Sequence, residues 1–204
     1  MNGITVDVNN PESRMLLISM RTLNNFAHAS KKASKVYDFD CILFDKSNNC
    51  LVSTNSISLM IWKVNDEELL KDLNRKCRST WTFFKYNMVW QKLEEKQMDP
   101  RKFPMYKKAI PEYSKYAKIN VESDFESSIS SSDKWIYYME YACLLEGRRF
   151  NPVWFRMLGN IEFSTIHFGV SSGLRSIMLK SKKNRMMVII SSYIDREIKI
   201  FDKK

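Results

Sequence analysis

The stretch Asn160-Ile-Glu-Phe-Ser-Thr-Ile-His-Phe-Gly-Val170 decides the fold class of this chain. Its side chains alternate, as in a β-strand, where successive residues point to opposite faces. One face carries Ile161, Phe163, Thr165 and His167, and the other carries Glu162, Ser164, Ile166 and Phe168. Because both faces include large apolar groups, we expect a strand that is covered on both sides.

Two further runs downstream, residues 176–180 and 186–194, have the composition of strands. The turn between them, Ser181-Lys-Lys-Asn-Arg185, is strongly basic. Three strands at this spacing with polar turns predict an antiparallel meander that presents positive charge at a hairpin tip.

Upstream of this meander, strands and helices are mixed. Residues 1–10 read as an extended arm, and Asn10-Pro11-Glu12 reads as the cap and first turn of a helix. Residues 38–45, 50–54 and 57–64 predict a second meander. Residues 66–96 predict a long helix because apolar side chains recur at helical spacing, and residues 134–146 predict another. The sequence therefore predicts an α+β fold, in which amino- and carboxyl-terminal meanders form an antiparallel sheet packed by about three helices. Residues 11–204 would form one domain, with an exposed basic and serine-rich loop at residues 99–133.

Charge is the strongest functional signal. The net charge of this 204-residue chain is +10, and the excess is concentrated in two tracts. Residues 101–118 contain six basic side chains against one acidic, and residues 171–204 contain nine against three. An excess of this size favours an anionic partner, either nucleic acid or an acidic membrane surface.

These tracts supply the candidate site. The expected anion-binding residues are Arg101, Lys102, Lys107, Lys108, Lys115, Lys118, Lys180, Lys182, Lys183 and Arg185. Tyrosines interleave with the first tract, and the expected aromatic contacts, to unpaired bases or a membrane interface, are Tyr106, Tyr113 and Tyr116. The alternative for both sets is a solvated basic loop.

Catalytic patterns are weak. The chain has five glycines and no phosphate-binding glycine loop, and it has two histidines and four unpaired cysteines without metal-ligand spacing. Asp38 and Asp40 could hold Mg²⁺ for phosphoryl chemistry, although such a pair is common at solvated strand ends. We expect no enzyme activity, cofactor or small-molecule substrate. The amino terminus has no signal-peptide pattern, so we expect a soluble, non-secreted protein of the cytoplasm or nucleus, peripheral to a membrane at most.

The segment Phe150-Asn-Pro-Val-Trp-Phe-Arg-Met-Leu-Gly-Asn-Ile-Glu-Phe-Ser-Thr-Ile166 resembles rhabdovirus matrix proteins, in which an aromatic-proline segment and a glycine turn precede an alternating strand. The resemblance covers under a tenth of the chain, which also lacks a Pro-Pro-x-Tyr motif near its amino terminus. It implies a self-associating virion matrix protein that bridges nucleoprotein and an acidic membrane. The alternatives are a single-stranded RNA-binding accessory or movement protein, and a Mg²⁺-dependent nuclease using Asp38 and Asp40.

Overall fold

The structure is a computed structural model. It describes residues 3–7, 9–25, 36–112, 116–121, 136, 138, 150, 152–156, 158, 161–169 and 176–191. The predicted helix at residues 134–146 lies largely outside these ranges, and Ile136 and Tyr138 within it are helical.

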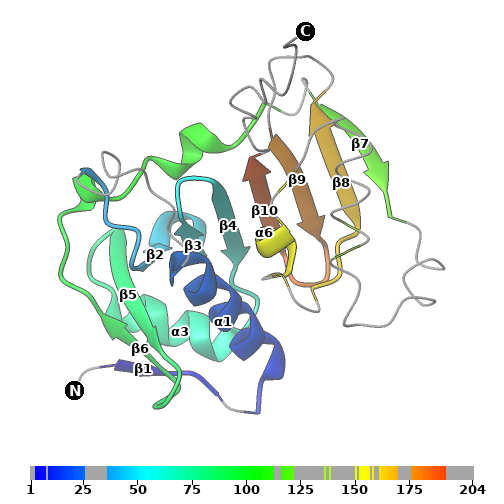
Figure 1. Cartoon of the computed structure of the whole chain (residues 1–204). Coiled ribbons are helices and arrows are strands. Elements are labelled where there is room, and N and C mark those ends of the chain that lie inside the picture. The colour runs from blue at the N-terminus through cyan, green and yellow to red at the C-terminus, as the bar shows by residue number, and fades with distance from the viewer. Residues whose placement is uncertain are drawn as a thin grey trace, which may run out of the picture.

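One antiparallel sheet organises the molecule (Figure 1). Its strands are β1 (Gly3–Thr5), β2 (Ile42–Asp45), β3 (Cys50–Thr54), β4 (Ser58–Lys63), β5 (Trp81–Asn87), β6 (Lys92–Glu95), β7 (Tyr116–Asn120), β8 (Thr165–Gly169), β9 (Ser176–Ser181) and β10 (Met186–Ser191). Their order across the sheet is β1-β6-β5-β2-β3-β4-β10-β9-β8-β7. The predicted α+β fold with an antiparallel sheet is confirmed.

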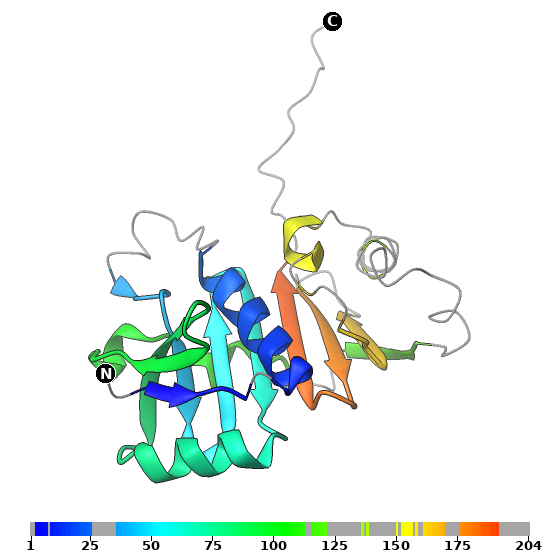
Figure 2. The same cartoon turned by 90° about the horizontal axis from the view of Figure 1, so that it is seen from below.

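The two predicted meanders meet in the middle of the sheet. The β2-β3-β4 meander and the β8-β9-β10 meander join through their last strands, where Met187 of β10 lies opposite Ile61 of β4. In Figures 1 and 2 the two halves therefore lie side by side. The short strand β1 closes one edge of the sheet by pairing with β6, so part of the predicted arm is a strand.

Helices α1 (Pro11–Asn25) and α3 (Glu67–Lys76) cover one face of the amino-terminal half, and a short helix, α6 (Pro152–Arg156), precedes β8 (Figure 1). The Asn10 carboxamide oxygen caps α1 by accepting from the Ser13 amide at 3.1 Å, as predicted. Asp66 caps α3 through the Leu69 amide and also accepts from the Ser13 hydroxyl of α1. One carboxylate thus fixes the starts of both helices. None of the described helices is long and apolar enough to cross a membrane.

The face of the sheet that these helices contact, here called the helix face, carries the larger core. Leu16 and Met20 of α1 and Leu73 of α3 pack there with alternate residues of the strands, such as Phe44 and Trp62. All five side chains are fully buried. The apolar stripe of each helix is therefore what holds it on the sheet.

The opposite face has a smaller core covered by residues 98–110, which we call the strap. The strap includes the 3-10 turns η2 (Pro100–Lys102) and η3 (Tyr106–Ala109). Its Phe103 and Tyr106 are buried against Leu43, Val52 and other strand residues of what we call the strap face. Strap and sheet are joined at Asp45, whose carboxylate accepts from the Tyr106 hydroxyl at 2.7 Å.

The structure corrects the long helix predicted at residues 66–96. The helix ends at Lys76, and residues 81–95 form the β5–β6 hairpin. Phe83 packs into the strap-face core, whereas Phe84 and Tyr86 pack into the helix-face core. The spacing of these aromatic residues is compatible with one apolar face of a helix. In the structure they instead pack on both faces of a strand.

The central strand is shorter than predicted, because it begins at Thr165. The chain bends at Ser164, whose hydroxyl donates to the Lys180 carbonyl. This bend shifts the alternation: Phe163 packs in the helix-face core with Ile166. The predicted common face of Phe163, Thr165 and His167 is therefore wrong. Burial on both sides is confirmed, since Ile166 and His167 are both buried.

Candidate functional site

A continuous row of residues crosses the strap face from one half of the sheet to the other. Directly opposite positions in neighbouring strands link Phe83, Leu43, Val52, Ile61, Met187, Lys180, Thr165 and Asn120. The strap packs over Leu43, Val52 and Phe83 at the start of this row. Further along, the row residues Ile61, Met187, Lys180 and Thr165 line a groove.

This groove has a volume of about 530 Å³. Apolar side chains of β4 and β10, Ile61 and Met187, line it together with Thr165 and His167 of β8. Its basic residues are Lys63, Lys118, Lys180, Lys182 and Arg185, and no described Asp or Glu lines it. Strand alternation explains the arrangement, because Lys63 follows Leu59 and Ile61 on one face of β4 and Lys180 follows Met178 on β9.

The basic side chains of the groove are accessible. Lys63, Lys118, Lys182 and Arg185 are exposed, and none of the four has an ion pair among the described residues. Arg185 lies in the β9–β10 turn at a φ of 47°, and the amide of Lys63 donates to its carbonyl at 3.0 Å. The turn is thereby fixed against the end of β4, which brings Arg185 and Lys63 together.

His167 lies within the groove and is 7% exposed. Burial lowers its pKa, and the positive charges of Lys180 and Lys118 lower it further. The imidazole is therefore neutral near neutral pH. The Thr165 hydroxyl lies 3.4 Å from His167 Nε2.

The predicted anion-binding residues fall into two groups. Lys118, Lys180, Lys182 and Arg185 converge on the groove, whereas Arg101, Lys102, Lys107 and Lys108 lie on the strap. Lys183 is beside the groove and faces Glu162 at 3.8 Å. Lys115 and Tyr113 lie outside the described residues.

The strap cations are partly neutralised. Arg101 pairs with Asp99 at 2.7 Å, and Lys107 Nζ lies 3.3 Å from the Asp45 carboxylate. Burial by itself would raise the pKa of Asp45, but hydrogen bonds from Tyr106, Asn48 and Lys107 outweigh it and hold that pKa below its usual range. Asp45 is therefore the buried anion to which the strap is attached.

The tyrosines differ from the prediction. Tyr106 and Tyr116 are buried, and the Tyr116 hydroxyl hydrogen-bonds to the Ser176 hydroxyl at 2.7 Å. Neither ring offers a stacking surface. In the loop predicted as exposed at residues 99–133, the strap packs on the sheet through Phe103 and Tyr106 while most of its other side chains are exposed, and residues 116–120 pair in the sheet as β7. The serine-rich part, residues 122–133, lies outside the described residues.

The groove residues that sequence reasoning missed include Lys63, Thr165 and His167. Lys63 lies outside both basic tracts, so the charge count gave no reason to choose it. A signal was available in the alternation Leu59, Ile61, Lys63, which predicts a lysine on the same face as two apolar residues. His167 was expected to be a sheet-face residue, and it is one.

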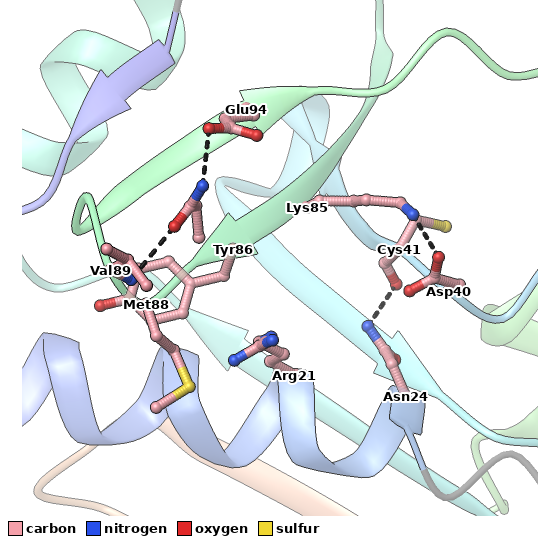
Figure 3. A pocket seen from close by; sticks show the side chains of 10 residues that line it. Arg21, Asn24, Asp40, Cys41, Lys85, Tyr86, Met88, Val89 and Glu94 are labelled. Carbon is pink, nitrogen blue, oxygen red and sulfur yellow. Dashed lines mark hydrogen bonds and ion pairs between the residues drawn. The ribbon is translucent and has the colours of Figure 1, made fainter.

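A second cavity, of about 310 Å³, lies between α1 and the β5–β6 hairpin (Figure 3). Asp40 lines it and pairs with Lys85, while Asp38 pairs with Lys96 at 2.5 Å. Burial opposes ionisation of Asp38, but the Lys96 ammonium outweighs it and lowers the pKa. Both carboxylates of the predicted Mg²⁺ pair are thus bound by lysines, and a cation would have to displace them. In the described part of the chain, no three acidic, histidine or cysteine side chains are grouped as metal ligands.

The described cysteines agree with the absence of paired metal-ligand spacing in the sequence. Cys41, Cys50 and Cys77 are buried and free, and burial raises the pKa of Cys41 to about 12. Cys143 lies outside the described residues.

No family model and no curated protein matches this chain. Solved structures with a similar fold include DNA polymerase III subunit beta from Borrelia burgdorferi, at 14% identity over 95% of this chain with a TM-score of 0.49. Others are the DNA polymerase III beta chain of Streptococcus pneumoniae, at 12% identity over 95% of this chain with a TM-score of 0.47, and the Helicobacter pylori beta clamp, at 9% over 94% with 0.43. This chain spans only 64% to 65% of the length of those chains.

These neighbours correct the matrix-like function expected from the sequence. The solved structures named above are bacterial DNA polymerase III beta subunits, and none of them is a viral matrix protein. The matrix role in a virion is therefore withdrawn. Within the segment at residues 150–166 that resembled matrix proteins, Pro152–Arg156 form α6, the chain bends at Ser164, and residues 165 and 166 belong to β8.

Proposed function

We propose that this protein is a non-catalytic nucleic-acid-binding domain, and that the groove on the strap face contacts the phosphate backbone. The observation that supports this most directly is the convergence of five basic side chains on one groove with no described carboxylate among its lining residues. Nucleic acid is also compatible with the DNA polymerase neighbours. The proposal rests on the groove and does not depend on the similarity to these structures.

The composition of the groove indicates the mode of binding. Four of the five basic groups are lysines, which bind phosphate as point charges, whereas bidentate reading of base edges favours arginine. Among the described residues, no Phe, Tyr or Trp lines the groove, so it lacks the large aromatic stacking platforms of single-strand binding sites. We therefore expect binding with little sequence preference.

Salt dependence tests the proposal. Each phosphate contact contributes a slope of about −0.9 to log K against log salt for duplex DNA. Reversing three groove charges together, Lys63→Glu, Lys118→Glu and Lys182→Glu, should weaken binding of a labelled short DNA duplex at least tenfold. It should also flatten the salt slope by roughly two to three.

The matched control reverses three exposed charges away from the groove: Arg14→Glu, Lys71→Glu and Arg78→Glu. Both triple variants change the net charge equally, so a general effect of charge would weaken both. Binding should survive in the control, as measured by fluorescence anisotropy between about 50 and 200 mM salt. Equal loss in the two variants would refute the groove as the binding site.

Self-association, which the sequence predicts, is part of the same proposal. Sedimentation at several protein concentrations measures it directly. A monomer at all concentrations would remove it while leaving the groove proposal intact.

A further inference from the structure

We infer that the end of the groove between β7 and β9 is a phosphate subsite, formed by Lys118, Thr165, His167 and Lys180. Its ligand is a phosphate group, presented either by a nucleic-acid backbone or as free phosphate. The backbone source rests on the proposed function, whereas the subsite itself does not.

Strand register places the four side chains together. Lys118 on β7 lies directly opposite His167 on β8, and Thr165 lies directly opposite Lys180 on β9. Directly opposite residues have Cβ atoms about 4.5–5.5 Å apart. All four side chains line the same groove, so they share one face of the sheet. A phosphate group bound between these side chains can therefore contact all four of them.

The four residues supply two kinds of donor. Lys118 and Lys180 supply full positive charges, and Lys118 is exposed to an incoming anion. Thr165 and His167 are 4% and 7% exposed, so their polar atoms are held in place by the surrounding sheet. Because the Thr165 hydroxyl and His167 Nε2 lie 3.4 Å apart and hydrogen-bond to each other, one member of this pair can donate to a phosphate oxygen while two ammonium groups balance its charge. Preorganised donors of this kind need little reordering on binding.

The charges around His167 make it a reporter of occupancy. Among the described residues, its charged neighbours on the flanking strands are Lys118 and Lys180, and the other ionisable groups of the groove are Lys63, Lys182 and Arg185. All are cationic, and together with burial they disfavour the imidazolium form. An anion bound among them reverses that local field, so the pKa of His167 must rise when the subsite is filled. By linkage, a phosphodiester, whose own charge is constant in this range, then binds more tightly as pH falls through the pKa of His167.

The experiment follows the His167 ring by NMR. The chain has only two histidines, so His28 is an internal reference, and a His28→Gln variant assigns the signals. The pH titration is run with sodium chloride, with inorganic phosphate at equal ionic strength, and with a short DNA oligonucleotide. We expect phosphate and oligonucleotide to raise the His167 pKa and leave His28 unchanged. Lys118→Gln should abolish the rise, and Lys71→Gln should retain it.

The outcomes separate this inference from the proposed function. If the oligonucleotide binds by anisotropy but neither ligand moves His167, the subsite is wrong and the groove proposal stands. If inorganic phosphate moves His167 but the oligonucleotide does not bind, the subsite is a free-phosphate site and the nucleic-acid function fails. Equal shifts in chloride and phosphate would show ionic screening alone and would overturn the subsite.

Discussion

Removing the Tyr106 hydroxyl should destabilise the protein measurably, because that hydroxyl joins the strap to a buried carboxylate. It donates to Asp45 Oδ2 at 2.7 Å, and both side chains are buried. A hydrogen bond to a charged partner contributes about 1.5–3 kcal/mol. Asp45 also accepts from Asn48, and its Oδ1 already lacks a partner among the described residues. Few other donors can therefore replace the lost hydrogen bond to the carboxylate. Tyr106→Phe should lower the free energy of unfolding by about 1.5–3 kcal/mol.

Urea unfolding at pH 7 measures this cost, with Tyr37→Phe as the control. Tyr37 is exposed, so its hydroxyl should contribute less than about 0.5 kcal/mol. Because the folded-state pKa of Asp45 lies below its usual range, the stability that it contributes is present above pH 4 and is lost as pH falls through the folded pKa. The difference between parent and Tyr106→Phe should therefore shrink in acid. Equal unfolding midpoints for Tyr106→Phe and Tyr37→Phe at pH 7 would refute the role assigned to this bond.

Other substitutions test the helices and the sheet by the same unfolding measurement. Phe163→Ala should cost about 3–5 kcal/mol, because the ring is fully buried and packs edge-on against Tyr138 at 5.1 Å; a neutral result would contradict its place in the core. Asp66→Ala should cost about 0.5–2 kcal/mol through loss of the α3 cap, and a smaller loss in Asp66→Asn would support the capping role. Trp90→Ser should change stability by less than about 0.5 kcal/mol, because the indole is 65% exposed in the β5–β6 turn; a large loss would mean that the ring is packed.

Local sequence patterns predicted the strands of both meanders, apart from the start of β8, and the start of the first helix. The apolar runs within residues 176–191 and the basic turn at residues 181–185 are visible without a structure, because a strand that is buried on two faces selects apolar side chains at every position. Asn10 and Pro11 likewise mark a helix start through local hydrogen bonding and fixed backbone geometry. The concentration of positive charge was also evident, since charge is a property of composition.

Tertiary structure alone decided the rest. Residues 81–87 satisfy both helical and strand spacing, and pairing with β2 and β6 selects the strand. Tyr106 belongs to a basic, proline-containing tract that reads as exposed, but a carboxylate far away in the sequence, Asp45, provides a buried partner for its hydroxyl. The groove could not be predicted for the same reason. Its cations come from β4, β7, β9 and the β9–β10 turn, and only the pairing of β4 with β10 brings Lys63 beside the others. Sequence spacing fixes which face of its own strand a side chain occupies, whereas long-range strand pairing fixes its neighbours.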